Sequence, residues 1–343
     1  MRILVTGGCG FLGSNISAYE QSLGHEIIVF DNLSRKGSEL NRQWLESKGN
    51  IRVVIGDTRK QDQVDALFQQ YKFDGVFHLA GQVAMTTSIS NPRLDFETNT
   101  MGTFNVLDAI RRIQPDTPLI YSSTNKVYGD LEQYDYIENE TRYICPDHPD
   151  GFDEKTPLDM HSPYGVSKGA ADQYVLDFAR IFGLKTAVFR HSSMFGGRQF
   201  ASYDQGWIGW FCAKAHERKL DSSAPAFTIC GNGKQVRDVL HADDIVRLYE
   251  RALVNIDRIS GEAFNIGGGM NNSLSLLELF AILEEKLDVH LEYTKLAPRI
   301  SDQKIFVADT AKIRSRIDWD IQVNTNDGID AALSWAEKIL EID

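Results

Sequence analysis

The first 190 residues of the chain alternate between short apolar runs and longer amphipathic segments. The apolar runs end at Thr6, Phe30, Ile55, Leu79, Tyr121 and Phe189. Because these runs are almost unbroken by polar positions, they are typical of strands covered on both faces. Helical periodicity separates them, for example over 60–71 and 95–113. The alternation predicts an α/β fold with a doubly wound parallel sheet and right-handed crossovers.

The alternation of apolar runs and amphipathic segments becomes irregular after residue 191. Shorter segments with clusters of aromatic residues and glycine follow. We predict a Rossmann domain over 1–191 and a smaller substrate-binding lobe mainly over 192–343, with some of its segments returning to the first domain. Residues 130–161 form a polar stretch rich in Asp, Glu, Tyr and Pro. Since it is too long for a routine connection, we expect a lid, an oligomer contact or a mobile loop.

Charge and composition exclude several classes of partner. The chain has 48 acidic and 36 basic residues, a net charge of -12, whereas nucleic acids and anionic membranes require a basic surface. No apolar run approaches the ~20 residues that span a bilayer, and we expect no signal peptide before the first apolar run. The cysteines, Cys9, Cys145, Cys212 and Cys230, have no metal-binding spacing. We therefore expect free thiols, a cytoplasmic location and no metal.

A glycine motif follows the first predicted strand and opens a predicted helix, with Gly7, Gly10 and Gly13 in register. In this context the glycines let the backbone approach a pyrophosphate, and the helix N-terminus supplies N–H donors. Asp31 ends the second strand, where a carboxylate can bind both ribose hydroxyls and would repel a 2'-phosphate. Arg35, close behind, weakens that preference. The motif predicts NAD as the cofactor.

Further residues at the ends of strands complete the predicted cofactor groove. Asp57 is placed to meet the adenine edge, although a turn or helix-cap aspartate has the same pattern. His191 fits a structural histidine as well as a cofactor contact. The predicted groove residues are Gly7, Gly10, Phe11, Leu12, Gly13, Asp31, Asn32, Ser34, Arg35, Asp57, Thr58, Leu79, Ala80, Gly81, Gln82, Asn99, Ser122, Tyr164, Lys168 and His191.

Tyr164 and Lys168 stand four residues apart on a predicted helix and therefore share one face. An ammonium beside a phenol favours the phenolate, so we expect Lys168 to lower the pKa of Tyr164 and make it a general base. A surface pair has the same spacing. Thr124, at the end of the fifth strand, adds a hydroxyl where open α/β sheets bind ligands. These three residues are the predicted catalytic set.

The glycine motif, SSTNKVYG (122–129), YGVSK (164–168) and GNGKQVRDV (231–239) together resemble the extended short-chain dehydrogenase/reductase family over nearly the whole chain. Within it the sequence is most similar to enzymes that epimerise CDP-linked 3,6-dideoxyhexoses at C2. The stretches that carry this likeness are TGGCGFLGSN, FHLAGQVAMTTS, YSSTNKVYGDLEQY, HSPYGVSKGAADQY and FRHSSMFGGRQFASYDQGW. The resemblance implies tightly held NAD, a CDP-linked or other nucleotide-linked sugar, and a homodimer or homotetramer. Without the resemblance, the residues predict the redox site but neither the sugar, the nucleotide nor the choice between C2 and C4.

Two residues after Thr124 distinguish between reactions of this family. Its sugar dehydratases carry Asp-Glu there, whereas this chain has Asn125 and Lys126. Since neither is a carboxylic acid, elimination of water lacks its acid and base. We expect an NAD-dependent epimerase, with a 4-epimerase, a 4,6-dehydratase and a non-catalytic NAD-binding regulator as alternatives. A decarboxylase would need a cation such as Lys126 or Arg198 to hold a substrate carboxylate.

A nucleotide sugar also requires cations for its diphosphate. Arg237 and Arg299 are the candidates, because a planar guanidinium matches phosphate geometry; each would otherwise form a surface ion pair. Gln205 and Trp207 would hold the nucleotide, or else pack the small lobe. The predicted substrate residues are Met85, Thr86, Thr124, Asn125, Ser193, Gln205, Trp207, Arg237 and Arg299.

Overall fold

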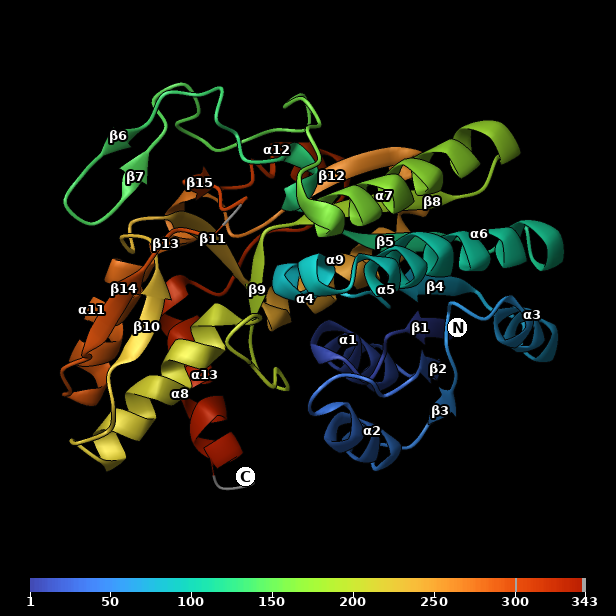
Figure 1. Cartoon of the computed structure of the whole chain (residues 1–343). Coiled ribbons are helices and arrows are strands. Elements are labelled where there is room, and N and C mark those ends of the chain that lie inside the picture. Colours follow the sequence, from blue (N-terminus) through green and yellow to red (C-terminus); the bar gives the residue numbers. More distant parts are fainter. Residues whose placement is uncertain (300, 341–343) are drawn as a thin grey trace.

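The chain folds into two lobes built around one large sheet (Figure 1). The computed structural model describes residues 1–299 and 301–340. In this part of the chain the large lobe contains a seven-stranded parallel sheet in the order β3-β2-β1-β4-β5-β8-β12. Its strands are β1 (Arg2–Thr6), β2 (Glu26–Asp31), β3 (Ile51–Ile55), β4 (Gly75–His78), β5 (Leu119–Thr124), β8 (Thr186–His191) and β12 (Glu262–Ile266). The predicted doubly wound sheet is confirmed, and its order reverses between β1 and β4, where such sheets bind ligands.

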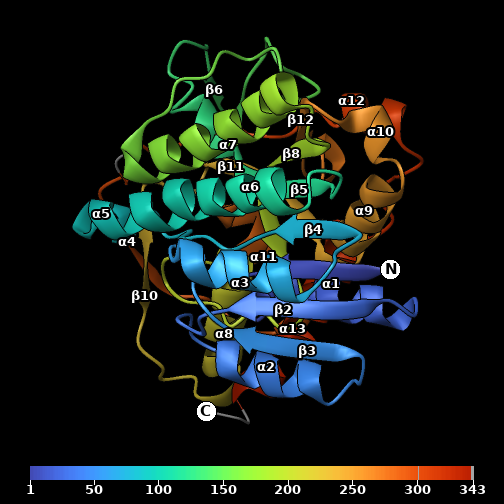
Figure 2. The same ribbon diagram turned by 90° about the vertical axis from the view of Figure 1, so that its right-hand side faces the viewer.

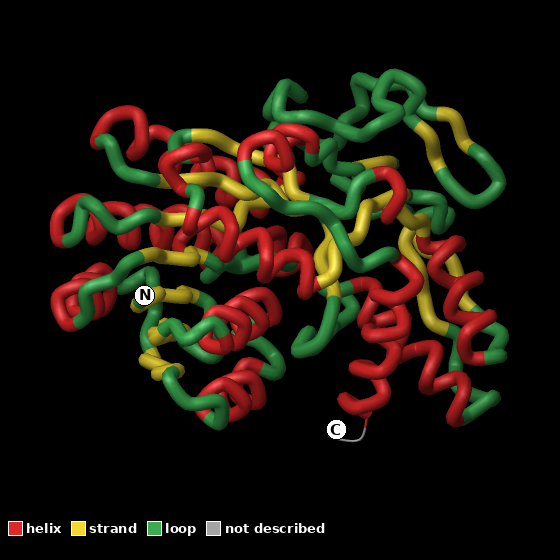
Figure 3. The backbone as a smooth tube through the Cα atoms, turned by 180° about the vertical axis from the view of Figure 1, so that it is seen from behind, coloured by secondary structure: helices red, strands yellow, loops and turns green. Residues whose placement is uncertain are grey.

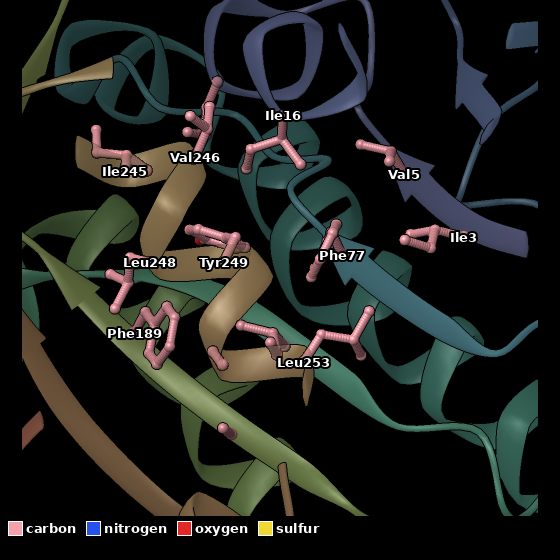
Figure 4. Close-up of a cluster of buried hydrophobic side chains, with 14 of the residues drawn as sticks. Ile3, Val5, Ile16, Phe77, Phe189, Ile245, Val246, Leu248, Tyr249 and Leu253 are labelled. Carbon is pink, nitrogen blue, oxygen red and sulfur yellow. The ribbon is translucent and has the colours of Figure 1, made fainter. Parts of the chain in front are cut away.

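Helices cover both faces of this sheet, as Figure 2 shows from the side. One face carries α1 (Phe11–Ser22), α2 (Ser38–Glu46), α9 (Ala242–Val254), α10 (Ile256–Ile259) and α12 (Ala311–Arg316). The other carries α3 (Gln61–Gln70), α6 (Gly102–Ile113) and α7 (Ser162–Phe182). Figure 4 shows the apolar core between the sheet and the first of these two helix layers, where Ile16 of α1 and Tyr249 of α9 pack near Phe77 of β4. Because both faces are buried, the strands lack alternation, as the sequence pattern predicted.

The helix predicted over 95–113 is present but not uniform. It comprises α5 (Pro92–Phe96), a π-helical turn η1 (Glu97–Met101) and α6. Met85–Ser90 form a further helix, α4, before it. The helix predicted over 60–71 is α3.

The small lobe is assembled from segments after β8. Its strands are β9 (Ser193–Phe195), β10 (Phe227–Cys230), β11 (Val236–His241), β13 (Ser273–Ser275), β14 (Tyr293–Leu296) and β15 (Ile305–Phe306), and its helices are α8 (Trp207–Leu220), α11 (Leu276–Leu287) and α13 (Thr325–Leu340). Between them, α9 and β12 return to the large lobe, where β12 pairs with β8. The lobes therefore interleave in sequence.

The 130–161 stretch packs against the small lobe. It carries the short hairpin of β6 (Ile137–Glu138) and β7 (Tyr143–Ile144), which projects from the molecule in Figure 3. Phe152 is fully buried in a cluster with Val236 and Phe306, and its N–H donates to the Val307 carbonyl at 2.7 Å. The expectation of a mobile loop is therefore wrong for this buried part, because its apolar side chains complete a core.

Among the described residues, no helix has the length and apolar character to cross a membrane. The same part of the chain holds no cluster of His, Cys, Asp and Glu suited to a metal ion, and all four cysteines are free.

Candidate active site

The glycine turn joins β1 to α1 at the point where the sheet order reverses. Gly7 has φ +69°, and a Cβ on it would lie 2.7 Å from the backbone nitrogen of Ala80. A Cβ on Gly13 would collide with the Gly7 carbonyl. Only glycine allows the turn and the end of β4 to approach this closely. The N-terminus of α1 then opens on a groove, an arrangement that suits an anionic diphosphate.

Asp31 is fixed at the end of β2. Its carboxylate accepts hydrogen bonds from the Cys9 N–H at 2.9 Å and the Leu33 N–H at 2.8 Å. Burial raises the pKa of Asp31 while these two hydrogen bonds lower it. The carboxylate thus lies between the glycine turn and the loop after β2, where a ribose would be bound.

Asp57 has the contacts of a turn aspartate. It accepts from the Arg59 N–H at 3.0 Å, as a turn aspartate does, and pairs with the Arg59 guanidinium at 2.5 Å. Asn32 also donates to it at 3.3 Å. Asp57 nevertheless lines the groove.

The groove has about 1140 Å³ of space, including its open side. Fifteen predicted cofactor residues line it: Gly7, Gly10, Phe11, Leu12, Gly13, Asp31, Asn32, Ser34, Arg35, Asp57, Thr58, Leu79, Ala80, Gly81 and Ser122. These features fit NAD: the glycine turn allows close approach of a diphosphate, the N-terminus of α1 faces it, and the Asp31 carboxylate is held where a ribose would bind.

The groove is also lined by residues that the sequence did not indicate, which are Cys9, Phe30, Lys36, Asn41, Gly56, Val83, Thr98, Met194, Arg198, Gln199 and Phe200. The last three and Met194 come from the segment that follows β8, as does Gln205, which was predicted to hold the substrate nucleotide and also lines this groove.

Three predicted cofactor residues are buried among protein partners instead. The Gln82 N–H donates to Asn99 at 2.8 Å, and the Asn99 amide donates back to the Gln82 carbonyl at 3.0 Å. His191 shares a hydrogen bond of 2.9 Å with the Tyr249 hydroxyl, and its ring stacks on that of Tyr249. Burial lowers the pKa of His191 to about 3, so it is neutral. This environment matches the structural alternative for His191.

The predicted catalytic residues converge beside the groove. Tyr164 and Lys168 lie on the first turns of α7, and Thr124 ends β5. Loss of hydration raises the pKa of Tyr164 to about 12, against the opposing effects of a hydrogen bond with Thr124 and the charge of Arg35. The Thr124 side chain also accepts from the Lys126 N–H at 3.3 Å. The phenol and the hydroxyl are thus paired at the carboxyl end of the sheet.

The predicted effect of Lys168 on Tyr164 is wrong for the chain by itself. The Lys168 ammonium donates to the Ser122 carbonyl at 2.5 Å and lies 4.3 Å from the centre of the Tyr121 ring. Burial lowers the pKa of Lys168 to about 7, partly offset by Asp172 and Asp95. Lys168 is therefore directed at the end of β5, and burial rather than its charge dominates the pKa of Tyr164.

A second cavity, with about 840 Å³ of space including its open side, lies in the small lobe. It is lined by four of the predicted substrate residues, Gln205, Trp207, Arg237 and Arg299. Gln205 also lines the first groove, so the two cavities meet there. The predicted substrate residues Met85 and Thr86 begin α4, and neither is among the described residues that line the two cavities.

The cations of this second cavity are held by protein partners. Arg237 pairs with Asp302 at 2.8 Å, and both side chains are mostly buried. The Arg299 guanidinium lies 5.1 Å from the centre of the Tyr203 ring and donates to the Tyr203 carbonyl at 3.4 Å. Both guanidinium groups are thereby fixed in the cavity wall, a geometry suited to a diphosphate.

Other side chains orient the cavity wall. Ser193 accepts from the Trp207 indole N–H at 3.1 Å, which fixes the ring. Asn125 donates to Gln303 at 3.1 Å, and the Lys126 ammonium donates to the Ser301 carbonyl at 3.0 Å. Burial and the charge of Arg237 lower the pKa of Lys126 to about 8. The two residues after Thr124 therefore connect the end of β5 to the loop that carries Arg299.

Comparison with known proteins gives a consistent result. The NAD dependent epimerase/dehydratase family matches residues 3–267. The CDP-paratose 2-epimerase of Salmonella typhi is 60% identical over 339 residues, covering 99% of this chain and all of that protein. The solved UDP-glucose 4-epimerase of Thermotoga maritima with UDP-glucose is 28% identical (TM-score 0.82, 99% of this chain and 100% of that chain). The solved UDP-glucose 4-epimerase of Thermus thermophilus with NAD is 25% identical (TM-score 0.79, 98% and 99%).

Proposed function

The chain belongs to the NAD dependent epimerase/dehydratase family, and from this premise we propose that it is a CDP-paratose 2-epimerase that produces CDP-tyvelose. The observation that carries the proposal is the 60% identity with the Salmonella typhi enzyme over 99% of the chain. The site supports it, because Thr124 and Tyr164 lie beside the dinucleotide groove and the groove meets a second, arginine-containing cavity.

The cofactor NAD, when bound, supplies reversible oxidation of an alcohol carbon. Tyr164 accepts the proton of the C2 hydroxyl and returns it after the keto sugar has rotated to present its opposite face. Thr124 shares the proton through its hydrogen bond with the phenol. Arg237 and Arg299 hold the diphosphate throughout. The sugar turns because only its nucleotide end is held firmly.

Arrangement of the charges explains how Tyr164 could lose its proton. In the chain alone its pKa is about 12. The charge of Arg35 already lowers this pKa. The positively charged nicotinamide ring of bound NAD, if it lay beside the phenol, would lower it further. The general base is therefore active only when the groove is filled.

The same residues disfavour a dehydratase. Asn125 and Lys126 are bound to Gln303 and the Ser301 carbonyl, and neither offers a carboxyl group for elimination. A 4-epimerase differs only in which sugar carbon faces Tyr164, so the substrate must be tested directly.

The test is turnover of CDP-paratose labelled with deuterium at C2, followed by NMR. We expect CDP-tyvelose that retains the deuterium at C2 in ordinary water, because the hydrogen leaves and returns within one site. Loss of the label to solvent would instead indicate deprotonation chemistry and refute the proposal. Epimerisation of UDP-glucose at C4, with no reaction of CDP-paratose, would identify a 4-epimerase.

We further propose that the enzyme works as a homodimer or homotetramer in the cytoplasm. Several apolar side chains on α5, η1 and α7 are exposed to solvent in the single chain: Phe96 (50%), Met101 (40%), Val166 (51%) and Tyr174 (43%). Exposed apolar groups on adjacent helices are typical of subunit contacts. A reducing compartment agrees with the four free cysteines. Sedimentation would reveal a dimer or tetramer, and a monomer at micromolar concentration would contradict the proposal.

A further inference from the structure

A short segment after β9 crosses from the small lobe to the dinucleotide lobe (Figure 1). We name residues 197–200 the strap. The Gly197 carbonyl accepts from Asn15 of α1 at 2.9 Å, and the Arg198 carbonyl accepts from Asn41 of α2 at 3.2 Å. Asn41 also donates to the Cys9 carbonyl in the glycine turn at 3.0 Å. One amide side chain thus joins the strap to the turn that faces the groove.

Arg198 is the main side-chain contact of the strap. It has φ +65°, an uncommon backbone conformation for a residue with a side chain. Its guanidinium donates to Asn41 at 2.9 Å and to the Leu40 carbonyl at 3.3 Å. The same group lies 4.5 Å from the centre of the Trp44 ring and 5.0 Å from that of Trp335. Arg198 therefore connects α2 of one lobe to α13 of the other by hydrogen bonds and cation–π contacts.

Neighbouring residues reinforce this connection. The Trp335 indole N–H donates to the Gln199 carbonyl at 2.9 Å, and its ring packs edge-on against Phe200 at 5.5 Å. The Phe200 ring fills the space where a side chain on Gly37 would lie, and Gly37 has φ +79°. The strap thus seals against the loop between β2 and α2.

This seal lies over the cofactor site. Arg198, Gln199 and Phe200 line the same groove as the glycine turn and Asp31. The groove is therefore enclosed on one side by the dinucleotide lobe and on the other by a segment that belongs to the small lobe.

We propose that the strap retains NAD between turnovers and that Arg198 is the residue that fastens it. The inference rests on the proposed function, because an epimerase regenerates its oxidised cofactor in every cycle and never needs to exchange it. A segment fixed over the groove would slow cofactor exchange in a dehydrogenase, which must release its reduced cofactor. It would not slow an epimerase, which keeps the same NAD from one turnover to the next. Arg198 is also unavailable for a substrate carboxylate, since its guanidinium is held by α2 and the two indole rings.

The experiment measures the loss of NAD from the purified holoenzyme. Wild type and Arg198→Ala are passed over a desalting column, and the remaining NAD is released with acid and quantified against time. We expect at least tenfold faster loss from Arg198→Ala. The matched control is Lys48→Ala, since the Lys48 ammonium lies 4.5 Å from the same Trp44 ring and is absent from the groove lining. It should lose NAD within twofold of the wild-type rate.

A second variant covers the case in which Arg198→Ala lowers Tm. Trp335→Phe keeps an aromatic ring but removes the N–H donated to the Gln199 carbonyl and reduces the ring area that faces Arg198 and Phe200; its NAD loss should also be faster than wild type. Wild-type rates in a folded Arg198→Ala, or in Trp335→Phe where Arg198→Ala is unstable, would overturn the role of the strap and leave the proposed function intact. Wild-type enzyme that binds no NAD at all would refute the proposed function itself.

Discussion

Arg237 provides a quantitative test of the nucleotide cavity. Its guanidinium pairs with Asp302 at 2.8 Å, with the two side chains 15% and 24% exposed. If Arg237 also binds the substrate diphosphate, Arg237→Met removes at least one charge-assisted hydrogen bond, worth about 1.5–3 kcal/mol. That corresponds to a rise in KM of roughly 10- to 150-fold. The change also leaves the Asp302 carboxylate facing an anionic substrate, which adds to the loss.

The pair allows this second effect to be separated from the first. Arg237→Met with Asp302→Asn removes the repelling carboxylate, so we expect the double variant to recover part of the lost affinity. Asp302→Asn alone keeps the guanidinium and should leave KM the same or lower. Arg218→Met is the matched control, because Arg218 pairs with Glu292 at 2.8 Å in the same lobe and lines neither cavity.

Steady-state epimerisation of CDP-paratose, followed by NMR, supplies KM and kcat for each variant. A diphosphate contact present throughout the reaction changes KM and leaves kcat nearly constant. The reasoning is refuted if Arg237→Met changes KM by less than threefold, or if only kcat falls.

Three further predictions concern the reacting groups and the fold. Tyr164→Phe should lower kcat by about 10²–10⁴ with bound NAD unchanged, whereas Tyr174→Phe on the same helix should be neutral; an active Tyr164→Phe enzyme would exclude the phenol as the base. His78 is buried between Thr6 and Thr103, and burial lowers its pKa to about 3. Because the unfolded chain gains this proton below the ordinary pKa of 6.5, wild type should lose about 2 kcal/mol relative to His78→Asn between pH 6.5 and 5 in urea unfolding; an unchanged difference would contradict the assignment. Asp172→Ala leaves the buried Arg190 guanidinium without its carboxylate partner and should lower the free energy of unfolding by about 3–5 kcal/mol. Asp177→Ala, which breaks the exposed pair with Arg180 on the same helix, should lower it by less than about 1 kcal/mol. Equal losses would show that the buried pair has no special role.

The sequence by itself determined the large sheet, the glycine turn and the helix that presents Tyr164 and Lys168. These features depend on local patterns, because unalternated apolar runs define buried parallel strands and a four-residue spacing fixes one helix face. The motif GNGKQVRDV likewise indicated Arg237, which does line the second cavity. A residue's position on its own strand or helix was therefore predictable.

Only the tertiary structure decided what these side chains face. The pKa of Tyr164 depends on the burial of its phenol and on Arg35, more than a hundred residues away in sequence, and the Lys168 ammonium turned out to bind the Ser122 carbonyl. The strap binds Asn41 and Trp335 through contacts separated by more than 130 residues. Burial and through-space charge follow from how distant segments pack, and no spacing within one segment encodes them.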